Sequence, residues 1–122
     1  MEELLLLVDD EPDVLASTQW ILESHGYKVR TATSAEEAFR YFQALHPRLL
    51  LIDFKLPGAS GVDLLKWVHT TNPEIPSILI TGFSNQLEAM ESVGRQLGAF
   101  TCLPKPIKID QMLRVVQEAL AV

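Results

Sequence analysis

Two apolar runs without polar alternation constrain the fold of this chain more than any other feature. They are Leu4–Val8 and Leu49–Ile52, and every residue in them is aliphatic. A strand with one face in water alternates apolar and polar residues, whereas a strand covered on both faces is apolar throughout. The two runs therefore predict a parallel sheet with helices on both sides.

Strand-like runs alternate with helical patterns along the 122 residues. The predicted strands are Leu4–Val8, Lys28–Ala32, Leu49–Asp53, Ser77–Thr81 and Phe100–Leu103. Five helices are predicted between and after these strands. The first presents an apolar face from Val14 to Leu22, the second follows Ser34 with a capping box at Glu37, and the third follows Gly61. The fourth runs from about Asn85 toward Gly98 with an interruption at Gly94, and the fifth carries an apolar stripe from Ile109 to Leu120. Such a chain most simply forms one domain, residues 1–122, with a doubly wound five-stranded parallel sheet in the order 2-1-3-4-5.

Composition excludes several classes of function. The net charge of −6 argues against direct binding of nucleic acid, because no basic stripe displaces counterions. Cys102 is the only cysteine, and three scattered histidines give no zinc-ligand spacing. The run Leu4–Val8 is too short to cross a bilayer and follows two acidic residues, so we expect no membrane association and a cytoplasmic location.

Polar residues collect where the predicted strands end. Asp9 and Asp10 follow the first strand, Asp53 ends the third, Thr81 ends the fourth, and Lys105 follows the fifth. The carboxyl ends of parallel strands share one edge, so three carboxylates would converge there and repel one another. Mg²⁺ prefers such oxygen ligands and commonly shares its coordination shell with phosphate. The pattern predicts a magnesium site at which a carboxylate could attack phosphorus.

Each of these residues taken alone has a plainer interpretation. Asp9 or Asp10 could cap the first helix, and Asp53 could be a turn residue. Thr81 could serve packing at a strand end, and Lys105 could be a solvated surface lysine. Their joint placement at one edge of one sheet favours the functional interpretation.

Four segments together are similar to a known family. They are Val8-Asp9-Asp10-Glu11, Asp53-Phe54-Lys55-Leu56-Pro57-Gly58 with Gly61, Thr81-Gly82, and Leu103-Pro104-Lys105-Pro106. In this order and spacing the chain resembles, from end to end, the receiver domain of bacterial two-component response regulators. The resemblance implies the same flavodoxin-like (βα)5 fold and a phosphorylation-controlled signalling switch.

The resemblance also implies residue roles. Asp53 would accept a phosphoryl group from a phosphohistidine. Asp10 would bind Mg²⁺ directly, Asp9 largely through water, and the Lys55 backbone carbonyl would add a ligand; Mn²⁺ could take the same place. Thr81 and Lys105 match positions that contact the phosphoryl group. The family often has a cis peptide before the proline that matches Pro106.

Partners follow from the same resemblance. The donor would be a sensor histidine kinase or a histidine phosphotransfer domain, and a homodimer would form through the fourth helix, fifth strand and fifth helix. The chain would catalyse its own phosphoryl transfer and slow dephosphorylation without being a turnover enzyme. The Thr81–Ser84 stretch resembles receivers attached to hybrid sensor kinases, so an output or kinase domain would lie outside these residues.

Two departures from the family concern the response to phosphorylation. Cys102 stands where the family usually has an aromatic, so activation is expected to rely on Thr81 and on backbone movement around Gly82 and Phe83. We expect the Cys102 thiol to be buried. The interval from Thr81 to Lys105 is two residues longer than is usual in the family. The extra length falls in the region of the fourth helix, which with the fifth strand and fifth helix forms the family's common output surface.

Both tryptophans lie off the apolar faces of their predicted helices. Trp20 and Trp67 could be partly covered surface aromatics, or contacts for a kinase, a phosphotransfer domain or a second subunit. The first helix is a usual docking element of the family, which makes Trp20 the better candidate.

Two other functions fit a similar topology. A flavodoxin-like cofactor binder needs a Ser/Thr/Gly-rich phosphate loop after the first strand, where this chain has Asp9-Asp10-Glu11-Pro12-Asp13. A metal-dependent phosphohydrolase usually needs a second acid beside its nucleophile and an insertion that covers the substrate; here Lys55 stands two residues after Asp53.

Overall fold

The structure is a computed structural model that describes residues 3–82, 92, 94–96 and 98–121. Within these residues, the strands are β1 (Leu4–Val8), β2 (Lys28–Ala32), β3 (Leu49–Asp53), β4 (Ser77–Thr81) and β5 (Thr101–Pro104). The helices are α1 (Pro12–Ser24), α2 (Ala35–Leu45), α3 (Gly61–Thr71) and α5 (Ile109–Leu120). No helix among them is long and apolar enough to cross a membrane.

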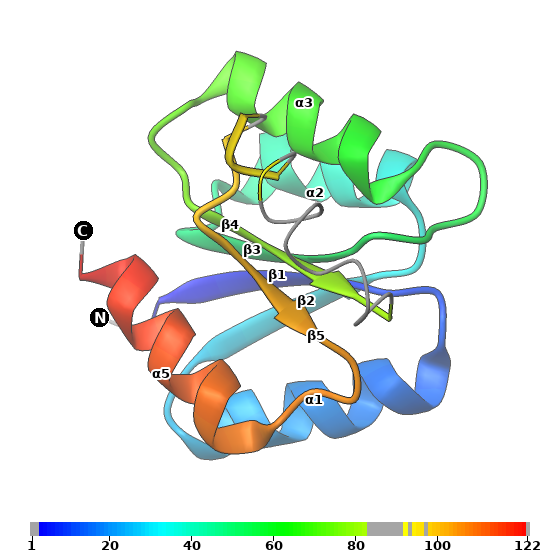
Figure 1. Cartoon of the computed structure of the whole chain (residues 1–122). Coiled ribbons are helices and arrows are strands. Elements are labelled where there is room, and N and C mark those ends of the chain that lie inside the picture. Colours follow the sequence, from blue (N-terminus) through cyan, green and yellow to red (C-terminus); the bar gives the residue numbers. More distant parts are fainter. Residues whose placement is uncertain (1–2, 83–91, 93, 97, 122) are drawn as a thin grey trace.

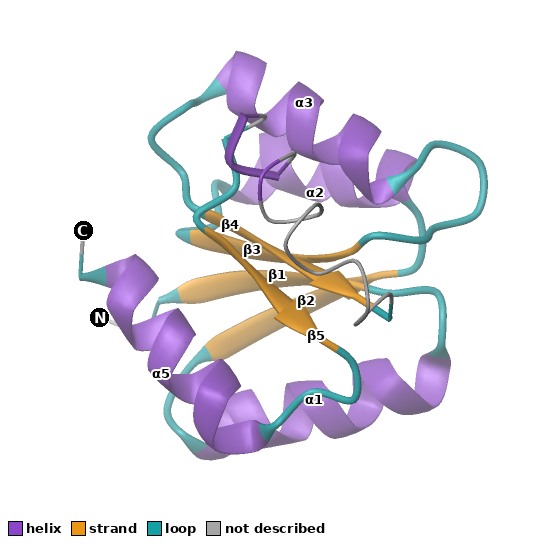
Figure 2. Cartoon of the chain, in the orientation of Figure 1, coloured by secondary structure: helices purple, strands orange, loops and turns teal. Residues whose placement is uncertain are grey.

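The strands form one parallel sheet in the order β2-β1-β3-β4-β5. Helices α2 and α3 cover one face of this sheet, and α1 and α5 cover the other (Figure 1). Figure 2 shows the resulting three layers, with the strands between two helical layers. The predicted sheet, its strand order and the two covered faces are confirmed.

The side chains of β1 are buried on both faces of the sheet, which explains why its sequence does not alternate between apolar and polar residues. Leu6 and Val8 belong to the core cluster that contains residues of α2 and α3. Leu5 and Leu7 belong to the cluster that contains residues of α1 and α5. Side chains of a strand point to opposite faces in turn, and both faces are buried here.

Helix caps only partly follow the sequence pattern. The Ser34 hydroxyl accepts the Glu37 N–H as predicted, but the Glu37 carboxylate accepts the N–H of Thr33 rather than that of Ser34, so the predicted capping box is incomplete. A complete capping box occurs at Ser60 and Asp63, at the start of α3. That helix is thereby fixed at its first residue, beside the loop that follows β3.

The region between β4 and β5 differs from prediction at the start of β5. The strand β5 begins at Thr101, one residue later than predicted, although the Phe100 N–H still bonds to the Ser77 carbonyl. Most of the predicted helix from Asn85 to Gly98 lies outside the described residues. Gly94 itself is described as helical, and a Cβ there would lie 3.3 Å from the Cys102 sulfur.

Candidate functional site

Asp53 and Asp9 lie side by side at the carboxyl edge of the sheet. Val8 of β1 pairs with Ile52 of β3, so the next residue of each chain segment reaches the same edge. Both side chains are almost wholly buried, each residue being 3% exposed. Asp10 follows in the turn before α1 and is exposed. The sheet register thus brings two buried carboxylates together, with a third at the mouth of the site.

The three aspartates form a cluster that could hold a metal ion. One carboxylate oxygen from each of Asp9, Asp10 and Asp53 lies within 4.8 Å of the others. The donor set is all oxygen and all anionic, which suits a hard divalent cation such as Mg²⁺. The geometry and the ligand chemistry both fit the metal that the sequence predicts.

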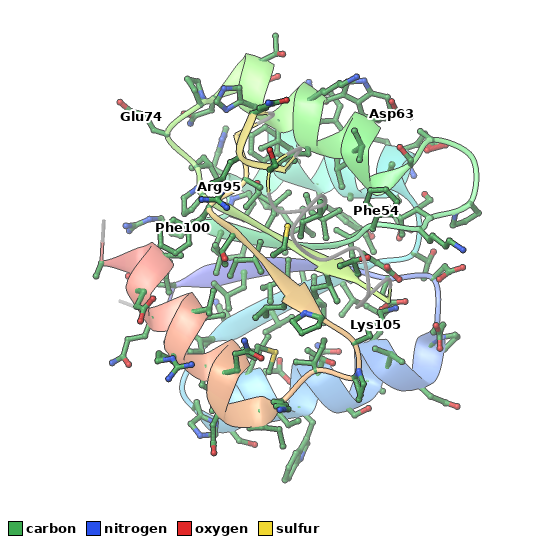
Figure 3. All side chains as sticks on the ribbon, in the orientation of Figure 1. Phe54, Asp63, Glu74, Arg95, Phe100 and Lys105 are labelled. Carbon is green, nitrogen blue, oxygen red and sulfur yellow. The ribbon has the colours of Figure 1, made fainter. Side chains whose placement is uncertain are left out.

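Lys105 brings a positive charge to the same carboxylates. Its Nζ donates to Asp53 Oδ2 at 2.9 Å and lies 3.6 Å from Asp9 Oδ2 and 3.8 Å from Glu11 Oε1. Figure 3 shows Lys105 on the segment that follows β5. Its backbone N–H donates to the Thr81 carbonyl at 2.8 Å, which ties this segment to the end of β4. The lysine is therefore positioned by the sheet itself.

The charges in this cluster shift the pKa values of two groups. Burial raises the pKa of Asp9 and the charge of Asp53 raises it further; the Glu11 N–H and Lys105 oppose the rise without cancelling it. Burial alone would lower the pKa of Lys105, but its hydrogen bond to Asp53 and the surrounding carboxylates raise it overall. Without metal, the protonated form of Lys105 is thus favoured, whereas the ionised form of Asp9 is disfavoured.

Backbone N–H groups fix the carboxylates. The Lys55 N–H donates to Asp53 Oδ1 at 3.2 Å, and the Glu11 N–H donates to Asp9 Oδ1 at 2.9 Å. Each carboxylate uses one oxygen for the backbone and turns the other toward Lys105. This arrangement limits rotation of both side chains.

Gly61 allows α3 to begin directly against the site. A Cβ at this residue would collide with the backbone carbonyl oxygen of Asp53. The Gly61 N–H donates to the carbonyl of Phe54 at 3.2 Å, closing the loop between β3 and α3. Gly61 stands out in the sequence only as part of a motif, and its closeness to Asp53 is visible only in three dimensions.

An open cavity of about 380 Å³ gives access to the cluster. Its lining residues are Asp10, Glu11, Asp53, Phe54, Lys55, Gly82 and Lys105. The cavity is lined mainly by acidic residues and by the two lysines Lys55 and Lys105, a combination suited to a metal ion and a small anion.

The structure assembles most of the predicted site residues. Asp9, Asp10, Asp53 and Lys105 meet, Gly82 borders the cavity, and Thr81 is buried at the end of β4. The Lys105–Pro106 peptide is cis, as predicted.

The remaining predicted residues stand apart from the cluster. Cys102 is buried in β5 as predicted, within the core on the α2 and α3 side. Trp20 is 71% exposed on α1. Phe83 lies outside the described residues.

Glu11, the third carboxylate near Lys105, stands out in the sequence only as part of a motif.

A family model of the response regulator receiver domain matches residues 5–117. The chain belongs to this family. Among curated proteins it is 35% identical to the nitrogen assimilation regulatory protein NtrX of Azorhizobium caulinodans over 95% of this chain and 26% of that protein. It is 33% identical to the DNA-binding transcriptional regulator NtrC of Escherichia coli over 97% of this chain and 25% of that protein. The chain thus spans about a quarter of the length of these relatives.

Solved structures agree with this membership. A CheY-like receiver domain protein from Methanospirillum hungatei superposes with a TM-score of 0.92 at 32% identity, over 99% of this chain and 95% of that one. The receiver domain of NtrX from Brucella abortus gives a TM-score of 0.90 at 32% identity, over 97% and 98% of the two chains.

Proposed function

We propose that the chain is a phosphorylation-controlled switch that accepts a phosphoryl group on Asp53 from a sensor histidine kinase or a histidine phosphotransfer domain. The observation that carries the proposal is the position of the Asp53 carboxylate. It lies 2.9 Å from Lys105 Nζ and within 4.8 Å of oxygens of Asp9 and Asp10. Membership in the receiver family supports this assignment.

Asp9, Asp10 and Asp53 would hold Mg²⁺, with the Lys55 backbone carbonyl as a further ligand and Mn²⁺ as a substitute. When bound, the metal would neutralise oxygens of the transferring group and of the carboxylates around it. The need for a metal follows from the charge balance, because the single ammonium of Lys105 faces the carboxylates of Asp9, Glu11 and Asp53.

Phosphoryl transfer at this site needs positioning more than proton chemistry. A carboxylate oxygen of Asp53 forms the new bond to phosphorus. The bond from phosphorus to the donor imidazole nitrogen breaks, and its electron pair stays on that nitrogen. Lys105, which donates to Asp53 in this structure, would then donate to a phosphoryl oxygen, and the Thr81 hydroxyl would donate to another.

The response to phosphorylation would begin at Thr81 and Gly82. The Thr81 carbonyl accepts the Lys105 N–H, so movement at the end of β4 is transmitted to the segment that follows β5. Cys102 supplies no aromatic side chain for the family's usual switch, and backbone movement around Gly82 and Phe83 would take its place.

A second cavity supports docking of the phosphodonor. It encloses about 560 Å³ between α1 and the segment after β5, and it shares Glu11, Gly82 and Lys105 with the site. Apolar residues such as Ile21 and Met112 line its far part. A donor helix seated there would bring its phosphohistidine to Asp53, with Trp20 as a further contact on α1.

The wider biological role also belongs to the proposal. The chain would act in the cytoplasm as a phosphoacceptor rather than a turnover enzyme, with slow dephosphorylation ending the signal. A homodimer would form through the fourth helix, β5 and α5. NtrC is named as a DNA-binding regulator, and because this chain spans only a quarter of it, any such output would come from a segment outside residues 1–122.

Intact mass spectrometry tests the central claim. With acetyl phosphate and Mg²⁺, the wild type should gain one phosphoryl group, and chelation of the metal should prevent the gain. Asp53→Asn should gain none, whereas the matched control Asp110→Asn, which alters an exposed carboxylate on α5, should behave as the wild type. Phosphorylation of Asp53→Asn at the wild-type rate would refute the assignment.

A further inference from the structure

A groove between α2 and α3 is separate from the phosphoacceptor site. Its volume is about 870 Å³, and all its lining residues belong to α2 and α3. These two helices cover the sheet face opposite α1 and α5 (Figure 1). We call this cavity the α2–α3 groove. Its lining residues are Glu36, Phe39, Arg40, Lys66, Trp67, Thr70 and Thr71.

Packed aromatic rings form the wall of the α2–α3 groove. The Phe39 and Trp67 ring centroids lie 5.5 Å apart at an interplanar angle of 57°, and Phe39 stacks on the buried Phe42 at 5.9 Å. Trp67 is half-buried, in contrast to Trp20, which is 71% exposed. Rings held in this way lose little conformational entropy on binding, and tryptophan is enriched among the residues that dominate binding energy.

Two cations border these rings. Arg40 follows Phe39 and Lys66 precedes Trp67, and both side chains are exposed. Neither forms an ion pair with any carboxylate in the described residues, whereas Lys105 lies near three. Glu36, one helical turn before Arg40, also lines the groove and lies next to Gly58 of the loop after β3. Two cations against one carboxylate give the lining a net positive charge, although the whole chain has a net charge of −6.

We propose that the α2–α3 groove docks an acidic amphipathic helix of a partner protein. An apolar ridge of that helix would pack on Phe39 and Trp67, and its flanking carboxylates would pair with Arg40 and Lys66. An amphipathic helix in a hydrophobic groove is a recurrent recognition mode, and charge complementarity selects the partner. The proposal does not depend on phosphorylation of Asp53, because the groove and the acceptor cavity share no lining residue.

Two helix-constrained peptides test the proposal. Both carry Leu and Phe at positions i, i+3, i+4 and i+7; one has Glu at the flanking positions and the other has Lys. The protein is Trp20→Phe, in which Trp67 is the remaining tryptophan and reports binding by its fluorescence. The acidic peptide should bind at least about tenfold more tightly than the basic one, and added salt should reduce the difference.

Variants separate recognition from folding. The double variant Arg40→Glu/Lys66→Glu should reverse the peptide preference, whereas Lys108→Glu/Arg114→Glu, which alters two exposed cations at α5, should leave it unchanged. Labelled-peptide anisotropy should show that Trp67→Ala weakens binding of the acidic peptide by at least about tenfold, while Trp67→Phe retains most of it. Equal affinity for the two peptides, or an unchanged preference in the groove double variant, would overturn the proposal.

Self-association is the rival occupant of the groove. Sedimentation velocity of the wild type and Trp67→Ala at equal concentrations distinguishes it, because a partner groove predicts the same sedimentation profile for both proteins. Association of the wild type that Trp67→Ala abolishes would assign the groove to a second copy and overturn the partner proposal.

Discussion

The Asp9 carboxyl group lies in surroundings that disfavour its negative charge. Burial and the neighbouring Asp53 raise its pKa above the ordinary 3.8, so the folded protein binds this proton more tightly than the unfolded chain does. Stability falls as pH rises wherever the folded state holds more protons. The contribution of Asp9 to stability therefore declines from about pH 3.8 up through its raised folded-state pKa, and a constant penalty remains above it.

Asp9→Asn should accordingly stabilise the metal-free protein at pH 7.5. The amide keeps an oxygen for the Glu11 N–H and removes the buried charge. We expect a gain on the order of 1 kcal/mol in the free energy of unfolding, measured by urea denaturation with EDTA present. The gain should shrink as pH falls through the raised pKa. A less stable Asp9→Asn at pH 7.5 would contradict this account, and exposed Asp10→Asn serves as the control.

The junction of β3 with α3 depends on Gly61. In Gly61→Ala the new methyl group would meet the Asp53 carbonyl, which is backbone and cannot rotate away, so α3 or the end of β3 must shift. We expect a loss of roughly 2 kcal/mol or more in stability and slower phosphorylation by acetyl phosphate. Gly82→Ala is the matched control for stability, because a Cβ there meets no atom of the described residues within 4 Å; its stability should stay within about 0.5 kcal/mol of the wild type. Equal losses of stability in the two variants would refute this role of Gly61.

Cys102 of strand β5 packs closely against the helical residue Gly94. The Cys102 sulfur lies 3.3 Å from where a Gly94 Cβ would stand, so a larger side chain at residue 102 has little space. Cys102→Tyr, which restores the family's aromatic, should cost about 1–3 kcal/mol by overpacking in the chain as it stands. Thermal or urea unfolding measures this cost, with Cys102→Ala as the control for loss of the thiol. A Cys102→Tyr protein as stable as the wild type would show that the segment near Gly94 moves aside.

Periodicity and strand ends predicted the sheet and most of the site, because both follow from local patterns repeated along the chain. The meeting of Asp9, Asp10, Asp53 and Lys105 required that the strands be parallel and that they follow the doubly wound order 2-1-3-4-5, which places the first strand beside the third. Side-chain contacts between helices were not predictable in this way.

Two features of the structure could not be predicted from local sequence patterns. A serine followed three residues later by a carboxylate fits both Ser34–Glu37 and Ser60–Asp63, yet only the second pair completes a capping box. The sequence places Trp67 off the apolar face of its helix, but the packing of Trp67 on Phe39 depends on how α3 lies against α2. Contacts between elements decide both cases.

Metal binding should increase the free energy of unfolding of the whole molecule. A ligand that binds only the folded chain adds RT ln(1 + [L]/Kd), which is about 1.4 kcal/mol at a free concentration about ten times Kd. The added term should be seen here because unfolding separates Asp9 from Asp53, which come from different strands of the sheet. For a domain of this size, we expect Mg²⁺ to raise the melting temperature by roughly 4–7 °C at that concentration.

Calorimetry in EDTA and in rising Mg²⁺ checks this expectation. The shift should follow log concentration once the site is saturated, because each tenfold increase adds the same free energy. Asp10→Asn removes an exposed ligand and should lose most of the shift while its melting temperature in EDTA stays near that of the wild type. Asp110→Asn, exposed on α5, should retain the full shift. An identical response of Asp10→Asn and the wild type would place the metal elsewhere, since a general salt effect acts on both alike.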